Sequence, residues 1–202
     1  MAAGRERDLE RLLTFIDAVV AIAITLLVLP LAEVGREVQD GDVAGLLREH
    51  VDDIVGFLLS FAVIARLWLA QHRIVSGLVR QSPVVVLLLL AWTFTIVVLP
   101  FPTALVAATV HDTLARVLYL GTMTVSSALL ALIARVIGRD RSLRDTEAGP
   151  DHVHATATTV AFLLALAISV VFPATTYWPL LLLLLVDPVV DRLRARRARA
   201  EA

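Results

Sequence analysis

Residues 11–31 read RLLTFIDAVVAIAITLLVLPL, an apolar stretch of 21 residues that carries one acidic side chain, Asp17. A helix of that length can cross the hydrocarbon core of a bilayer. The whole chain has a matching composition, because 58% of its residues are hydrophobic and 18% are charged. These proportions indicate a membrane protein. The chain contains no cysteine, which excludes a disulfide framework and thiolate metal sites.

Five further apolar segments follow the first. Scanning the chain with a window of about 19 residues locates the six segments at 12–32, 52–71, 83–106, 113–134, 153–173 and 177–193. We predict an all-α membrane protein in which residues 1–202 form a single domain of six transmembrane helices. Asp187 and Pro188 interrupt the last segment, so its ordered part is expected to be short.

The arginines alternate between the connections. They gather before the first segment, between the second and third, between the fourth and fifth, and after the sixth, whereas the intervening connections are mainly acidic. By the positive-inside rule, both termini are expected to be cytoplasmic. Each helix that runs outward ends in a proline motif, LVLPL, VVLPFP or VVFPAT, and the proline is expected to stop it at the membrane surface.

Asp17 needs an explanation because a carboxylate at mid-bilayer costs roughly 2.5–3.5 kcal/mol. It lies about 8 Å inside the cytoplasmic end of its helix, so its own cost is smaller. Candidate partners at a similar depth are Arg11, Arg66 and His72. The alternative is that Arg66 extends to the lipid headgroups and Asp17 meets water at the interface.

The helical period divides the first segment into two faces. At about 100° per residue, one stripe contains Phe15, Ala18, Ile22, Thr25, Leu26 and Leu29. Asp17 lies on nearly the opposite side, with Val20, Ile24 and Val28. An apolar stripe of this kind ordinarily faces lipid. Periodicity alone therefore does not distinguish a lipid-facing stripe from the lining of a pore.

The pattern R-x-x-x-F-x-D-A-x-x-A-I-A-I-T-L-L-V-L-P, from Arg11 to Pro30, resembles the first-helix signature of the transmembrane protein 175 family. That family comprises an endolysosomal potassium channel and its bacterial relatives. Ile16 stands where the family motif has serine. The stretch S-F-A-V-I-A-R-L-W-L-A-Q-H-R, with Ser60, Trp68 and His72, and L-P-F-P-T-A-L at 99–105 also agree. The second half is similar in hydropathy only.

The resemblance implies a potassium-selective cation channel in a bacterial inner (cell) membrane, assembled as a homotetramer around the first helix. It implies no enzymatic activity and no cofactor, with K⁺ as the permeant ion. Carried over by spacing from the F-x-D motif, the hydrophobic constriction falls on Ile22, Leu26 and Leu29, and Thr25 falls where the family has a threonine linked to potassium preference. The same resemblance implies a structural network made of Arg11, Phe15, Asp17, Trp68 and His72, in which Arg66 is a candidate to compensate for the missing serine.

Other classes of function remain open at this stage. A small secondary transporter would be expected to have discontinuous helices and a polar site at the midplane. A non-conducting membrane scaffold subunit is a further alternative. A membrane enzyme would have to use His152 and His154, but alternate positions point apart on a helix and no acidic ligand follows at metal-binding spacing, so no metal site is expected. No nucleic acid partner is expected.

Overall fold

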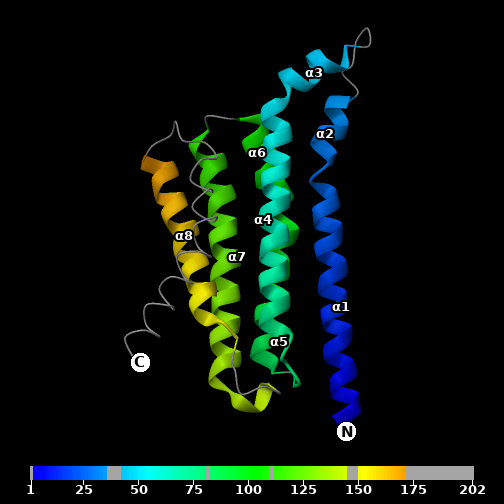
Figure 1. The fold of residues 1–202 in the computed structure, drawn as a ribbon, viewed down its shortest axis with the longest axis vertical. Helices are drawn as coiled ribbons and strands as arrows, with labels where there is room; N and C mark the ends of the chain where they lie inside the picture. Colours follow the sequence, from blue (N-terminus) through cyan, green and yellow to red (C-terminus); the bar gives the residue numbers. More distant parts are fainter. Residues whose placement is uncertain (1, 36–41, 81, 110–111, 145–149, 172–202) are drawn as a thin grey trace, which may run out of the picture.

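The computed structural model describes residues 2–35, 42–80, 82–109, 112–144 and 150–171. These residues form helices joined by short connections, with no strand among them (Figure 1). Five of the helical segments are long and apolar enough to cross a membrane. They confirm the first five predicted segments. The sixth, at 177–193, lies outside the described residues.

The first two spans and the connection between them contain four helices. The first span comprises α1 (Ala2–Leu26) and the short α2 (Leu29–Val34), and α3 (Val43–Glu49) leads into the second span, α4 (Val51–Val75). Asp42 caps α3 by accepting a hydrogen bond from the N–H of Gly45 at 2.9 Å.

The remaining spans contain α5 (Pro83–Val98) with α6 (Pro100–Ala108), then α7 (Thr113–Arg139), and finally α8 (His152–Val171). A 3₁₀ turn, η2 (Arg141–Leu143), follows α7. The helices α4 and α7 extend several residues beyond the predicted ends at 71 and 134. Their last turns carry Arg73 and Arg139, and both side chains are exposed.

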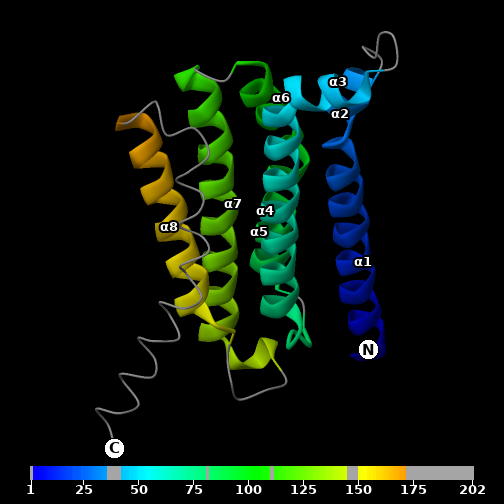
Figure 2. The ribbon, with the colours of Figure 1, turned by 45° about the horizontal axis from the view of Figure 1, so that its top comes forward.

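Helix α7 is the centre of the described structure. It packs on α8, α5, α6 and α4, whereas α1 lies at one edge and packs mainly on α5 (Figures 1 and 2). The largest fully buried side chains come from several helices and include Trp92, Phe162, Leu89, Met123 and Ile133. Because α1 contacts its own subunit on one side only, much of its surface is exposed.

The sequence predicted that the proline motifs would end the first and third spans, but both spans continue past Pro30 and Pro100. Proline has no N–H, so Pro30 and Pro100 cannot donate to the carbonyls four residues before them. The chain instead forms three-residue bonds, from Leu27 N–H to Ile24 at 3.3 Å and from Leu99 N–H to Ile96 at 3.3 Å. A second helix then begins at once, α2 or α6. Each span is therefore broken inside its length, and the third motif, at Pro173, lies outside the described residues.

The arginine-rich connections lie at one end of the molecule. The beginning of α1, the α4–α5 connection and the α7–α8 connection are all found there (Figure 1). An isolated bridge pairs Leu78 with Arg144, and the N–H of Val79 donates to the carbonyl of Leu143 at 2.9 Å. This end is the one that the positive-inside rule assigns to the cytoplasm.

Asp140 stabilises the turn after α7. Its Oδ1 accepts hydrogen bonds from the hydroxyl of Ser142 at 2.7 Å and from the backbone N–H of Ser142 at 3.0 Å. These bonds lower the pKa of the Asp140 carboxyl, and the positive charge of Arg80 lowers it further. A lowered pKa means that the contribution of the carboxylate is present above the pKa of the unfolded chain and is lost as the pH falls through the lowered value.

Candidate functional site

One face of α1 is buried against its own subunit. The buried residues recur at helical spacing and are Leu9, Ile16, Val20, Ala23 and Leu27. Intervals of three, four and seven residues place them on one side of the helix. Ile16, which stands where the family's first-helix motif has serine, is fully buried in this face. It therefore contributes apolar packing where the motif would place a hydroxyl.

The other face of α1 carries the predicted stripe, and the stripe is exposed in the single subunit. Phe15 is 55% exposed, Ile22 59%, Leu26 42% and Leu29 54%. Ala18 and Thr25 are exposed as well. On the side predicted to lie opposite, Val20 is buried, Asp17 and Ile24 are partly buried, and Val28 is 45% exposed. An exposed apolar face of this length requires either lipid or another protein surface to cover it.

Thr25 lies within the stripe, two residues before the irregular turn at residues 27–28. Its hydroxyl donates to the carbonyl of Ile22 at 2.7 Å, a bond within the same helix. This bond uses the hydroxyl hydrogen and leaves the lone pairs of the oxygen available to accept a hydrogen bond or to coordinate a cation. The irregular turn at residues 27–28 lies between Leu26 and Leu29, so the helix is interrupted within the predicted constriction.

Asp17 is hydrogen-bonded to α4. The indole Nε1–H of Trp68 donates to Asp17 Oδ1 at 2.8 Å, and both side chains are partly buried. The imidazole of His72, one turn after Trp68, lies beside the indole with 5.9 Å between ring centroids. The structure therefore brings together Asp17, Trp68 and His72 from the predicted network and ties α1 to α4 through one charge-assisted hydrogen bond.

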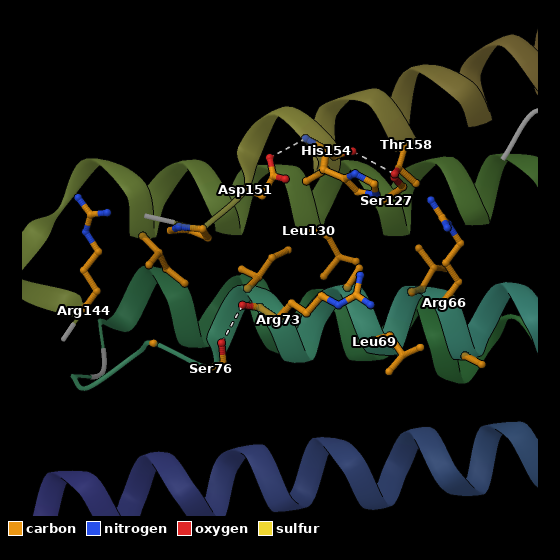
Figure 3. Close-up of a pocket in the computed structure, with 18 of the residues that line it drawn as sticks. Arg66, Leu69, Arg73, Ser76, Ser127, Leu130, Arg144, Asp151, His154 and Thr158 are labelled. Carbon is orange, nitrogen blue, oxygen red and sulfur yellow. Dashed lines mark hydrogen bonds between the residues drawn. The ribbon is translucent and has the colours of Figure 1, made fainter. Parts of the chain in front are cut away.

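Arg66 lies on the opposite side of α4. It precedes Trp68 by two residues, which is about 200° around a helix. Figure 3 shows its side chain directed toward α7 and α8 and away from α1. The structure accordingly does not place Arg66 beside Asp17. Arg11 and Phe15, the remaining members of the predicted network, are exposed on α1.

A second polar contact was not predicted as a pair. Ser60 of α4 and Tyr119 of α7 share a hydrogen bond of 2.8 Å between their hydroxyls, and both side chains are buried. Ser60 belongs to the second stretch that resembles the family pattern, but its hydrogen-bond partner follows only from the packing of α4 on α7. A hydroxyl buried in a span needs such a partner, because lipid offers none.

Most threonines of the spans bond to their own helix. The hydroxyls of Thr93, Thr95, Thr103 and Thr124 donate to carbonyls three or four residues earlier. His152 and His154, considered above as metal ligands, lie in the first turn of α8. Within the described ranges, no group of three or more His, Cys, Asp or Glu residues could hold a metal ion.

Comparison with known proteins points to one family. A model of the family described as endosomal/lysosomal potassium channel TMEM175 matches residues 11–100. A protein of Chamaesiphon minutus named as a potassium channel is 37% identical over 121 residues, which is 57% of this chain and 57% of that protein. The match thus spans little more than half of the relative. The residues 11–100 include the stripe on α1 and the Asp17–Trp68 contact.

Variants of Asp17 and Trp68 test the contact between α1 and α4. We expect Trp68→Phe and Asp17→Ala each to lower the free energy of unfolding by roughly 1–2 kcal/mol, because each removes a hydrogen bond to a charged group. Asp17→Asn should cost less, because an amide oxygen still accepts from the indole. Thermal unfolding in detergent measures the order of stability of these variants. Equal stability of Asp17→Asn and Asp17→Ala would contradict a structural role for this bond.

Proposed function

We propose that this chain, which belongs to the TMEM175 potassium channel family, is a potassium channel whose pore is lined by the exposed stripe of α1. Four subunits would surround the pore as a homotetramer in a bacterial inner membrane. The observation that carries the proposal is the exposure of Ile22, Leu26 and Leu29 on the face of α1 that its own subunit leaves uncovered. A homotetramer built around this face would cover it, and the same residues belong to the segment that the family model matches.

The constriction would be hydrophobic. Rings of isoleucine and leucine from four subunits form a neck that wets poorly, so conduction depends on its diameter and on how readily water enters it. The buried face of α1 holds the helix on α5, and the Asp17–Trp68 bond holds it on α4. These contacts determine how far each stripe projects toward the axis. In this proposal, Asp17 positions the pore helix and does not touch the ion.

The break before Pro30 supports a gating role for this region. The carbonyls near the end of α1 lack the regular bonds that would stiffen a continuous helix. A small change in tilt at residues 27–28 would move Leu26 and Leu29 relative to each other. Thr25 would face the permeating ion at the same level, with its oxygen lone pairs available when K⁺ loses part of its water.

A secondary transporter remains the second candidate because two spans are broken. Discontinuous helices often mark transporter binding sites near the midplane. Here the first break, after Leu26, lies toward the outer end of its span, whereas the second, after Val98, lies close to the middle of its span. The threonine hydroxyls around the second break bond to carbonyls of their own helix and do not converge on a common site. The geometry therefore favours the channel.

Ion flux tests the proposed function directly. The purified protein in proteoliposomes should take up potassium down its gradient, and uptake should be smaller when sodium replaces potassium. Uptake that requires a second, coupled ion gradient would favour the transporter. Absence of uptake of either ion by a verified tetramer would refute conduction and favour a non-conducting subunit.

Ile22→Asn tests the constriction. An amide on each subunit should hydrate the neck and raise potassium conductance several-fold in bilayer recordings, because a polar ring lowers the cost of wetting. The matched control is Leu87→Asn on α5, where leucine is 68% exposed on a different helix. It should leave conductance unchanged. Equal conductance in wild type and Ile22→Asn would remove Ile22 from the constriction.

Thr25→Ala tests ion preference. Removing the hydroxyl should shift the reversal potential, measured with potassium on one side and sodium on the other, toward zero. The control is Thr122→Ala on α7, which loses an equivalent bond from a threonine hydroxyl to a carbonyl of its own helix, the Leu118 carbonyl at 2.7 Å. An unaltered reversal potential in Thr25→Ala would show that the hydroxyl does not contribute to selectivity.

A further inference from the structure

A groove lies between α4 and α8 near the arginine-rich end of the molecule. Both helices pack on α7, which forms its floor (Figure 3). The volume of the groove is about 680 Å³. Arg66 lines it on the side of α4 that lies opposite Trp68. The groove is therefore separate from α1 and from the proposed pore.

The walls of the groove carry small and apolar side chains. Ala62 and Ala65 of α4 lie on one wall, Ala155 of α8 lies on the other, and Leu130 of α7 lies at the floor. Small side chains allow the backbones of membrane helices to approach each other closely. The ridge of one helix packs into a groove of this kind on its neighbours. The shape of the groove therefore suits a further helix of the bundle.

The chain that follows α8 can reach this groove. Helix α8 ends at Val171, at the end of the molecule away from the arginine-rich connections (Figure 1). The predicted sixth segment, 177–193, lies outside the described residues and begins after a connection of only five residues, 172–176. A connection this short places two helices side by side and antiparallel. The arginines from Arg192 onward then bring the end of this segment back to the arginine-rich end.

Arg66 places a positive charge within the second span. Its side chain is partly buried, and Figure 3 shows it directed toward α7 and α8. It lies nine residues before the end of α4 at Val75, roughly 14 Å along the helix. Among the described residues that line the groove, the acidic one is Asp151, which lies nearer the surface and caps α8 by accepting from the N–H of His154 at 3.0 Å. A charge at the depth of Arg66 suits a carboxylate at the same depth.

Asp187 is a carboxylate at a matching depth. It directly follows the apolar run LLLLLLV at 180–186 and precedes Arg192 by five residues, a distance of about 8 Å along a helix. On α4, Arg66 precedes Arg73 by seven residues, or about 10 Å. Measured from these surface arginines, the two charges differ in depth by less than the length of an arginine side chain. An acid at the end of an apolar run also needs a partner in a membrane.

We propose that residues 177–193 occupy the groove between α4 and α8 as the sixth span and that Asp187 forms an ion pair with Arg66. The pair would bring together two charges that are each costly alone within a span. A phospholipid in the groove would leave Asp187 without this partner. The connection of five residues favours the segment of the same chain over that of a second copy.

Charge reversal tests the ion pair. Arg66→Asp and Asp187→Arg each place two like charges together, so each should lower the melting temperature in lipid nanodiscs by about 10 °C. The double variant Arg66→Asp/Asp187→Arg restores opposite charges and should regain most of this loss. The matched control combines Arg66→Asp with Asp191→Arg, which reverses the acid four residues further along and should regain none. Equal melting temperatures of the two double variants would overturn the ion pair.

Disulfide crosslinking locates the segment and leaves both charges in place. The chain contains no cysteine, so any disulfide must join introduced thiols. Ala62 and Leu183 precede Arg66 and Asp187 by four residues each, about one helical turn. On oxidation in the bilayer, Ala62→Cys/Leu183→Cys should yield a monomer whose thiols no longer react with a maleimide. The control Phe94→Cys/Leu183→Cys uses a residue of α5 that is 68% exposed, and its thiols should stay reactive.

Two other results of the crosslinking would each overturn the proposal. Reactive thiols in both double variants would show that lipid, and not residues 177–193, covers the groove. A covalent dimer of Ala62→Cys/Leu183→Cys would show that a second copy supplies the segment. Neither the melting temperature nor the crosslink depends on ion conduction, so the outcome is independent of the proposed channel function.

Discussion

The constraint on which the structure depends is that lipid supplies no hydrogen-bond partners. Each apolar segment must satisfy its backbone internally and therefore becomes a helix. Pro30 and Pro100 have no N–H to donate, so the regular hydrogen-bond pattern is interrupted at these positions. Hydrogen bonds to carbonyls three residues earlier form there, and a new helix begins directly afterwards. Many of the described hydroxyl side chains follow the same rule. Threonines bond to their own carbonyls, and Ser60 finds Tyr119 on the neighbouring helix.

The same constraint explains why Asp17 can be tolerated in the first span. A carboxylate at this depth needs a donor, and the indole of Trp68 supplies one without adding a second charge. The bond orients α1 so that its apolar stripe faces away from the subunit. Together with the buried face of α1, Asp17 thus helps to position the helix that we propose lines the pore.

Charge is distributed over the two sides of α4 in different ways. Toward α1, α4 presents the aromatic pair Trp68 and His72, and toward α8 it presents Arg66 and Arg73. Residues two positions apart point to nearly opposite sides of a helix, so a single segment serves both surfaces. The first surface fixes the helix that we propose lines the pore. The second surface packs toward α7 and α8.

The sequence by itself determined the helical class, the first five spans within a few residues and the exposed stripe of α1, because these follow from apolar length and from the helical period. It also singled out Asp17, since an acid in an apolar run is costly wherever it packs. The resemblance placed Asp17 and Trp68 in one network, but only the tertiary structure gave the hydrogen bond between them and directed Arg66 to the other side of α4. It also decided that Tyr119 meets Ser60. Periodicity defines the faces of a helix, but the rotation of α4 between α1 and α7 decides which neighbour each face contacts. The breaks at Pro30 and Pro100 likewise continue into α2 and α6 because packing on neighbouring helices stabilises turns that proline alone would end.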